Sequence, residues 1–296
     1  MRGWLSSCIC PAGGEWMSRT LLVLFAHPDD ETFATGGTLA HYARRGVRTL
    51  LGCATRGEAG VVHEEGAEPP EDMGKVREEE LRCACRTLGV EEVRFLDYRD
   101  SGMVGSPDNE HPRAFVRADP EEVAGRILSL FREFRPQVVI TFGPDGGYGH
   151  PDHVAIHRHT VEAWQRAGDP ERCPDLAQDP PRKLYYLARP RHYYRRMRQM
   201  MWQMGLLEQA PAEEEVQRLG VPDEKVTTTV DIRDVLELKY QALRCHRTQL
   251  PPDSPWRNLP LDLLREYLGY EFFTLAAVRG EEIVTGEDDL FAGLAT

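Results

Sequence analysis

The chain has 296 residues, of which 41% are hydrophobic, so it can bury a sizeable core, and wholesale disorder is excluded. Its 36 lysine and arginine residues against 48 aspartate and glutamate residues give a formal net charge of -12. Such a chain has no global attraction to nucleic acid or anionic lipid, so we expect neither a nucleic-acid partner nor a membrane partner.

Apolar runs and helical segments alternate through the first two thirds of the chain. Strands are predicted over residues 20–26, 47–55, 92–98, 137–142 and 183–188, and helices over residues 36–45, 75–88, 119–134 and 152–166. Gly46 and Gly89 close the first two helices, and Asp119 followed by Pro120 starts the third. This order predicts an α/β fold with a doubly wound, mostly parallel sheet.

The pattern is less regular beyond Pro190. It predicts a methionine-rich helix over 193–205, a strand over 227–232, a helix over 235–247, a proline-rich loop over 251–260 and a last strand over 272–278. With no repeat and no low-complexity linker, one domain over residues 18–280 with an elaborated C-terminal part is the economical interpretation. Residues 1–17 are either a flexible extension or a misassigned start, and the acidic tail 281–296 is expected to be mobile.

The seven cysteines are an odd number, and none of them belongs to a CxxC pair. The two CxC pairs, Cys8/Cys10 and Cys83/Cys85, have no second pair at zinc-ribbon spacing. Reduced thiols are the simplest account, and we expect a cytoplasmic protein. No apolar run approaches the roughly 20 residues of a transmembrane helix, and the first sixteen residues make a poor signal peptide.

Two clusters of histidine and carboxylate side chains follow predicted strands. AHPDDE, residues 26–31, comes directly after the first strand, and GPDGGYGHPDH, residues 143–153, follows the fourth. In a doubly wound sheet of order 3-2-1-4-5 these two strands are neighbours, and their connections leave in opposite directions. Ligands bind in the crevice that opens there, at the carboxyl ends of the strands. We therefore expect the two clusters to form one site.

Spacing within the clusters suggests a metal site. His27 and Asp30 are three residues apart, which can direct both side chains at a common centre, and His153 joins them from the second cluster. Two imidazoles and one carboxylate leave an open position on zinc, as catalytic sites do. We expect His27, Asp30 and His153 to bind the metal and Asp29 to accept a proton from water.

His150 follows the glycine-rich loop that carries Tyr148. We expect His150 either to stabilise a developing oxyanion or to protonate a leaving amine. Each cluster by itself is also compatible with a simple loop, and a helix cap at Asp29 or Asp30 is a competing interpretation. The presence of both clusters, at neighbouring strand ends, favours the metal site.

AHPDDE, TRGE at residues 55–58 and HPDH at residues 150–153 together resemble the motifs of the zinc-dependent LmbE-like (PIG-L) deacetylases. That family includes the N-acetylglucosaminyl-phosphatidylinositol de-N-acetylases, and the deacetylases and conjugate amidases of mycothiol and bacillithiol metabolism. The resemblance covers roughly residues 18–278 and implies a Rossmann-like fold and the same metal triad and base. It also implies that His150 stabilises the transition state, that Asp152 orients His150, and that Tyr148 polarises the substrate carbonyl.

Other segments bear on the substrate. REEE at residues 77–80 and DYRDSGM at 97–103 resemble sugar-binding segments of the thiol-related members. Arg77 and Asp100 are therefore candidates to bind sugar hydroxyls. HRTQ at 246–249 resembles the family's C-terminal signature, so His246 is a candidate to line the cleft. A solvated helix face, a turn cap and a structural histidine are the respective alternatives.

The resemblance implies a Zn²⁺-dependent hydrolase that removes the N-acetyl group from an N-acetylglucosamine conjugate, such as a glucosaminyl-malate or a glucosaminyl-inositol. Amide cleavage in a thiol conjugate, and deacetylation of a chitooligosaccharide or antibiotic precursor, stay open, as does Fe²⁺ in place of Zn²⁺. A metal-free binding module would have lost a ligand or Asp29, and all are present. A homo-oligomer also stays open, with the methionine-rich stretch as a candidate face.

Overall fold

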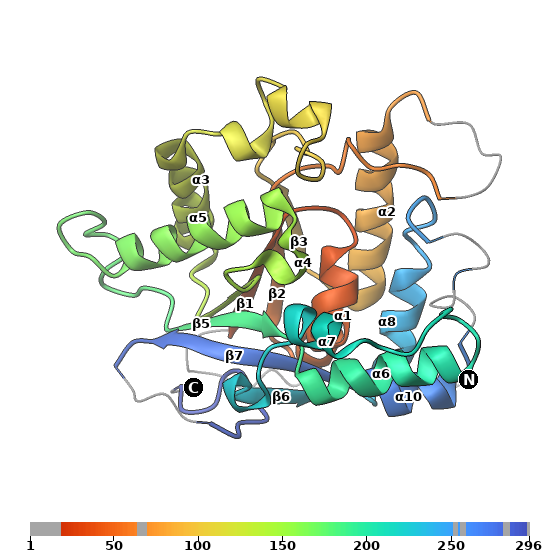
Figure 1. Cartoon of the computed structure of the whole chain (residues 1–296). Coiled ribbons are helices and arrows are strands. Elements are labelled where there is room, and N and C mark those ends of the chain that lie inside the picture. Colours follow the sequence, from red (N-terminus) through yellow and green to blue (C-terminus); the bar gives the residue numbers. More distant parts are fainter. Residues whose placement is uncertain (1–18, 64–69, 251–253, 255–258, 281–284, 295–296) are drawn as a thin grey trace, which may run out of the picture.

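The computed structural model describes residues 19–63, 70–250, 254, 259–280 and 285–294. Within these residues, seven strands form one sheet in the order β3-β2-β1-β4-β5-β7-β6, and helices cover both of its faces (Figure 1). The extension predicted for residues 1–17 lies outside the described residues. None of the helices in the described part is both long and apolar enough to cross a membrane.

Five parallel strands make up the part of the sheet that carries the two motif clusters. They are β1 (Thr20–Phe25), β2 (Arg48–Cys53), β3 (Glu92–Phe95), β4 (Val138–Thr141) and β5 (Lys183–Ala188). Every residue of β1 is buried, as expected for a central strand of a parallel sheet with helices on both faces. The predicted doubly wound, mostly parallel α/β fold and the strand order 3-2-1-4-5 are confirmed.

The C-terminal part extends the same sheet instead of forming a separate layer. β7 (Tyr270–Val278) pairs antiparallel with β5, and β6 (Thr228–Asp231) pairs antiparallel with β7. Both strands were expected from the sequence. Their antiparallel direction was not, because periodicity carries no information on which strands pair.

The helices lie in two layers and one flanking group (Figure 1). One layer contains α1 (Asp30–Arg44), α2 (Met73–Leu88) and α8 (Leu236–Leu243), and the other contains α3 (Pro120–Phe134) and α5 (Pro151–Ala167). The flanking group comprises α6 (Arg191–Gln203), α7 (Glu213–Leu219) and α10 (Leu261–Leu268). Short helices complete the described part: α4 (Gly146–Gly149), η1 (Pro107–Glu110), η2 (Phe115–Arg117) and η3 (Asp223–Lys225).

Two differences from the predicted helices have physical causes. α1 begins at Asp30, six residues before the predicted start, because the last two residues of AHPDDE, Asp30 and Glu31, already belong to its first turn. Gly37 lies inside this helix, where a Cβ would come within 2.2 Å of the Ile232 side chain, so glycine permits close packing here and does not mark a helix start. α7 and α10 were not predicted, since both are short and lie among proline-containing loops.

The acidic tail packs on the sheet over the residues that the structure describes, 285–294. Leu290 and Phe291 are buried, and Nζ of Lys183 in β5 lies 3.2 Å from Oε1 of Glu287. Two apolar side chains and a buried ion pair thus hold these residues against the rest of the chain, and the mobility expected for the tail stays a prediction.

Cys83 of α2 and Cys245, which follows α8, form a disulfide. The expectation of reduced thiols is wrong for this pair, because packing of α2 on α8 brings together two cysteines that are 162 residues apart in the sequence. Cys53, Cys85 and Cys173 are free and buried. The remaining cysteines, at positions 8 and 10, lie outside the described residues.

Candidate metal centre and active site

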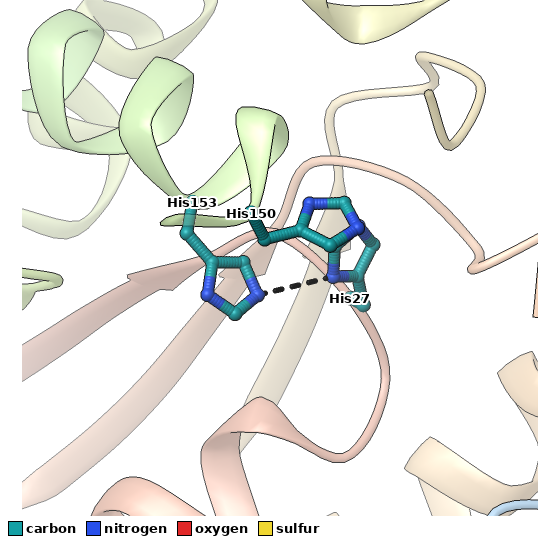
Figure 2. A group of neighbouring side chains, drawn as sticks. All are labelled: His27, His150 and His153. Atoms are coloured by element: carbon teal, nitrogen blue, oxygen red, sulfur yellow. Dashed lines mark hydrogen bonds between the residues drawn. The ribbon is translucent and has the colours of Figure 1, made fainter. Parts of the chain in front are cut away.

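The two motif clusters lie together at the carboxyl ends of β1 and β4, which pair in the sheet. His27 follows β1, whereas His150 is the N-cap of α5 and His153 lies in its first turn (Figure 2). Nδ1 of His27 and Nε2 of His153 are 3.3 Å apart. The predicted meeting of the two clusters is therefore observed, and it depends on the neighbouring positions of β1 and β4.

The ring of His27 is held from one side by two carboxylates. Its Nε2 lies 3.2 Å from Oδ2 of Asp152 and 3.4 Å from Oδ1 of Asp100. Burial alone would lower the pKa of His27, but the neighbouring carboxylates, Asp100 first, outweigh it and raise the pKa well above its usual value. Because Nε2 faces only acceptors, it carries a proton, and the lone pair of a neutral ring lies on Nδ1.

The ring of His153 is held by a backbone carbonyl and by an aromatic ring. Its Nδ1 lies 3.0 Å from the carbonyl oxygen of Gly146, which can only accept a hydrogen bond, so Nδ1 carries the proton. The ring also stacks on Phe142, with centroids 3.9 Å apart. The lone pair of His153 therefore lies on Nε2, the atom that faces His27.

Asp30 completes a set of three converging ligand atoms. Its Oδ1 lies 3.3 Å from Nε2 of His153, and its Oδ2 lies 3.6 Å from Nδ1 of His27. A tetrahedral ion with bonds of about 2.0–2.1 Å separates its ligand atoms by about 3.3–3.4 Å. Two imidazole nitrogens and a carboxylate that face one another at these distances can share a proton or hold a divalent cation between them. The residues present therefore fit a divalent cation.

Two further groups of possible ligands share His27. His150 joins His27 and His153 in one group, and Asp100 with Asp152 forms the other. Asp100 and Asp152 contact His27 at Nε2, whereas His153 faces Nδ1 on the other side of the ring. The two carboxylates therefore hold the His27 ring in place and do not face the atom that points at His153. The first group adds an imidazole beside the predicted triad.

His150 has a defined tautomer. Its Nδ1 accepts a hydrogen bond from the backbone N–H of Asp152 at 3.2 Å, so a neutral ring carries its proton on Nε2. Burial, reinforced by the nearby His27 and His153, lowers the pKa of His150 to about 4. A neutral ring is therefore the dominant form near neutral pH, and it can donate one hydrogen bond from Nε2.

Asp152 requires a correction to what the resemblance implied. We expected its carboxylate to orient His150. In the structure, Oδ2 of Asp152 contacts Nε2 of His27 and accepts a hydrogen bond from the backbone N–H of Ser101 at 2.9 Å. Asp152 contacts His150 through its backbone N–H alone. The side chain therefore orients His27, because the first turn of α5 directs it under that ring.

Asp29 has an unusual backbone conformation, with φ 101° and ψ -30°. A positive φ is rare for residues other than glycine and costs about 1–3 kcal/mol. Its backbone N–H donates to Oε2 of Glu31 at 2.9 Å, which helps to hold this conformation. Asp29 is the N-cap residue of α1, yet its side chain makes no cap hydrogen bond. The competing interpretation of Asp29 as a helix cap is therefore not supported.

The carboxylate of Asp29 is suited to accept a proton near neutral pH. Burial raises its pKa, Arg77 opposes this shift, and the resulting pKa is about 6. Nη2 of Arg77 lies 3.3 Å from Oδ2 of Asp29 and donates to the carbonyl oxygen of Pro28 at 2.5 Å. A carboxylate with this pKa is mostly ionised at pH 7 and still basic enough to take a proton.

The two residues expected to bind sugar hydroxyls are engaged with the protein. Arg77 is only 4% exposed and also donates to the carbonyl oxygen of Gly57 at 3.0 Å. A Cβ at Gly57 would lie 2.1 Å from Nη1 of Arg77, so glycine is required there. Asp100 is equally buried, faces His27 and accepts the backbone N–H of Gly102 at 2.8 Å. Arg77 thus holds Asp29 in place and Asp100 holds His27, and their contact with substrate stays a prediction.

His246 is buried against AHPDDE and does not line an open cleft. It is fully buried, and its Nε2 lies 2.8 Å from Oε1 of Glu31, whose other oxygen accepts the backbone N–H of Asp29. Burial alone would lower the pKa of His246, but the carboxylate of Glu31 raises it overall. Sequence reasoning missed this link, because Glu31 and His246 are 215 residues apart and no local pattern connects them.

Tyr148 is the exposed member of the site. Its side chain is 55% exposed and meets the ring of His153 edge-on, with centroids 4.9 Å apart. Partial burial and the nearby carboxylate of Asp30 raise the pKa of Tyr148 above its usual value. Its hydroxyl therefore keeps its proton near neutral pH and can donate a hydrogen bond towards a molecule in the site.

Comparison with known proteins identifies close relatives. Residues 22–164 match the PIG-L family, described as GlcNAc-PI de-N-acetylase. The chain is 40% identical to the 1D-myo-inositol 2-acetamido-2-deoxy-alpha-D-glucopyranoside deacetylase of Acidothermus cellulolyticus, over 94% of this chain and 96% of that one. It is 42% identical to the protein of the same name from Geodermatophilus obscurus, over 94% and 98% of the two chains.

Solved structures share the fold. The N,N'-diacetylchitobiose deacetylase of Pyrococcus horikoshii is 20% identical with a TM-score of 0.57, over 88% of this chain and 83% of that one. The 4-carboxy-2-hydroxymuconate hydratase GalB of Pseudomonas putida is 21% identical with a TM-score of 0.59, over 89% and 98%. Since a deacetylase and a hydratase are equally similar, these likenesses establish the fold and leave the reaction to the site.

Proposed function

Because the chain belongs to the PIG-L family, we propose that it hydrolyses the N-acetyl group of an N-acetylglucosaminyl-inositol conjugate. The names of the two relatives above support this substrate, and each is about 40% identical over nearly the whole chain. The structural observation that carries the proposal is the convergence of His27, Asp30 and His153 on one centre with Asp29 beside them.

We assign His27, Asp30 and His153 as the metal ligands in this proposal. A divalent cation bound there supplies Lewis-acid polarisation of the acetyl carbonyl and makes water more acidic. We propose Zn²⁺ as the ion, with Fe²⁺ as the alternative, since two imidazoles and a carboxylate accept either. Asp100 and Asp152 would raise the basicity of His27 as a ligand, because both accept from its other ring nitrogen.

The proton transfers follow from the positions of the protein groups. Asp29 takes a proton from the water that attacks the acetyl carbon, since its carboxylate is ionised and flanked by Arg77. The carbonyl oxygen then gains negative charge, and Nε2–H of His150 and the hydroxyl of Tyr148 are the available donors to it. The C–N bond breaks, acetate leaves, and the amine takes the proton that Asp29 held.

This arrangement favours one of the two roles expected for His150. With a pKa of about 4, the ring is neutral at pH 7 and holds a single proton, on Nε2. A neutral imidazole donates a hydrogen bond to an oxyanion, whereas an imidazolium would be needed to protonate an amine directly. We therefore assign His150 to the oxyanion.

The test is acetate release from purified protein with N-acetylglucosaminyl-inositol as substrate. N-acetylglucosaminyl-malate, N,N'-diacetylchitobiose and a thiol conjugate with a larger amide serve as competitors. Activity should be lost with a chelator and restored by Zn²⁺ or Fe²⁺, and kcat/KM should be highest for the inositol conjugate. A higher kcat/KM for any competitor would reassign the substrate, and activity that survives complete metal removal would reject the metal-dependent reaction.

Two further properties belong to the proposal. A cytoplasmic location is consistent with a small soluble sugar conjugate as substrate, and fractionation of cells tests it. For the oligomeric state, the partly exposed Trp202 and Met204 at the end of α6 are the candidate contact between copies. Light scattering of the wild type and of Trp202→Glu would test that face.

A further inference from the structure

The Cys83–Cys245 disulfide lies in the wall of a cleft between α2 and the end of α8, with a volume of about 600 Å³. Both cysteines line the cleft and are half-buried, so the disulfide borders the space that a small molecule in the cleft would occupy. No residue that we assign to the metal or to the reaction lines this cleft. It is therefore a separate feature of the molecule.

The cleft is rich in positive charge. Four exposed arginines line it: Arg82, Arg86, Arg244 and Arg247. Among the described residues, only two carboxylates do so, and one of them, Glu80, is buried and accepts hydrogen bonds from the backbone N–H and the hydroxyl of Thr248. Over the described residues, Arg82 pairs with Glu78, whereas the other three arginines have no carboxylate within 4.0 Å. On a chain of net charge -12, this cleft attracts anions.

We propose that the cleft binds small anionic thiols and that Cys83–Cys245 is the site at which they undergo thiol–disulfide exchange. The thiolate attacks one of the two cysteine sulfurs and forms a mixed disulfide with it. The original S–S bond breaks, and the other cysteine leaves with the electron pair as a thiolate. A second thiol molecule then resolves the mixed disulfide, so that the protein gains two electrons and the two thiols become one small disulfide. The arginines stabilise each thiolate.

The position of the disulfide connects this exchange to the catalytic base. Arg77, in the same helix as Cys83, contacts Asp29, and His246, adjacent to Cys245, contacts Glu31. The disulfide thus links α2, which contacts AHPDDE through Arg77, covalently to the segment after α8, which contacts it through His246. After reduction, the hydrogen bonds between Glu80 and Thr248 still connect these elements. We therefore expect the reduced protein to stay folded and to hold its base less firmly.

The first experiment compares two thiols of similar size and opposite charge, 3-mercaptopropionate and cysteamine. The metal-loaded, full-length protein is first oxidised with the disulfide of 3-mercaptopropionate, and mass spectrometry should then locate a Cys83–Cys245 bond. Rates of reduction are divided by the thiolate concentration of each reagent. We expect the anion to react about 10-fold or more faster at low salt, with the preference shrinking as salt is added.

The arginine dependence is tested with Arg86→Gln/Arg244→Gln/Arg247→Gln. The preference for the anion should disappear in this variant. It should persist in a matched control that loses the same charge elsewhere on the exposed surface, Arg45→Gln/Arg218→Gln/Arg265→Gln. Failure of the disulfide to form, equal rates for the two thiolates, or a preference that survives the first variant would each overturn the proposal.

The connection to the base is tested first by a measurement that does not depend on activity, and then by kcat. Hydrogen–deuterium exchange in a peptide covering residues 26–33 should be faster in the reduced protein and in Cys83→Ser/Cys245→Ser than in the oxidised protein. In a deacetylase assay, kcat should fall in parallel, and the double serine variant should no longer respond to thiols. Unchanged deuterium exchange rejects the coupling. Failure to release acetate from any substrate would concern the proposed function and leave the exchange results standing.

Discussion

Nη2 of Arg77 lies 3.3 Å from Oδ2 of Asp29 and donates to the backbone carbonyl of the preceding Pro28. A buried guanidinium thus sets both the position and the charge of the carboxylate that we assign as the base. Gly57 makes room for it, since any side chain there would meet the guanidinium. The arrangement has direct consequences for the pH dependence of the reaction.

Arg77→Gln should displace the acidic limb of the kcat/KM profile to higher pH. Burial raises the pKa of Asp29 to about 6 and Arg77 lowers it, so loss of the positive charge raises it further. At a given pH, less of the base is then ionised. We expect a displacement of about one unit relative to wild type. A bound cation lowers the pKa of Asp29 in both proteins, so the difference between the two profiles is the quantity to measure.

Lys75→Gln is the matched control, because Lys75 is an exposed cation on the same helix and pairs with Asp72. Its profile should coincide with that of the wild type. An Arg77→Gln profile that is lower at every pH but not displaced would mean that Arg77 positions the loop without influencing the ionisation of Asp29.

Asp29→Asn and Asp30→Asn should separate the base from the metal ligand. Asp29→Asn should lower kcat by about 10²–10⁴-fold with a full complement of metal, because general-base catalysis contributes that range. Asp30→Asn should lose metal as well as activity, since Asp30 is the carboxylate that faces both histidines. Metal analysis of the two purified variants, alongside acetate release, distinguishes them. Equal loss of metal in both would reject the division of roles.

Asp152→Asn should weaken metal binding by about 10–100-fold, the usual effect of losing a carboxylate that supports a histidine ligand. The structure directs the Asp152 side chain at His27, and the substitution leaves an amide of the same shape there. Competition with a chromophoric chelator measures the affinity. If Asp152 instead orients His150, kcat should fall while metal affinity stays at the wild-type value, and our correction would be wrong.

His246→Gln should destabilise the protein in a pH-dependent manner. Glu31 raises the pKa of His246 above 6.5 in the folded protein, so His246 binds its proton more tightly in the folded state than in the unfolded state. This stabilisation is complete below pH 6.5 and is lost as the pH rises through the folded-state pKa. Urea unfolding should show a deficit of about 1–3 kcal/mol at pH 6 that shrinks towards pH 9.

His157→Gln provides a comparison of opposite sign. Burial lowers the pKa of His157, whose Nδ1 lies 2.8 Å from the carbonyl oxygen of Phe142. As the pH falls below 6.5, His157 therefore takes up a proton in the unfolded chain at a higher pH than in the folded protein. Acidification then lowers the stability of the wild type, and the glutamine variant does not lose this part of its stability. A deficit of His246→Gln that grows with pH would contradict the assigned pair with Glu31.

Much of this molecule follows from local sequence signals. The alternation of apolar runs and helices predicted the parallel part of the sheet, and AHPDDE and HPDH at two strand ends predicted that His27, Asp30 and His153 would meet. Strand order makes this inference possible, because a doubly wound sheet brings the carboxyl ends of β1 and β4 together. The chemistry of the three side chains then suggests a metal without any tertiary information.

The supporting contacts could not be predicted in this way. Arg77 resembled a substrate ligand and His246 a cleft residue, yet both lie behind the AHPDDE loop. The Asp152 side chain contacts His27 and not His150, which no local pattern indicates either. What each of these side chains contacts depends on the rotation of its helix or loop about its axis. Hydrophobic periodicity predicts which face of an element is buried, but it does not predict which other element packs against that face.

The sequence by itself determined the strands, most of the helices and the candidate site residues, and it placed two clusters separated by more than a hundred residues at the carboxyl ends of neighbouring strands. The tertiary structure alone decided which carboxylate supports His27, what holds Asp29 at a positive φ, and that Cys83 meets Cys245. The physical reason is the sequence distance over which each kind of information acts. Hydrophobic periodicity and strand-end chemistry act over a few residues, whereas these contacts depend on how α2, α5 and α8 pack on the sheet.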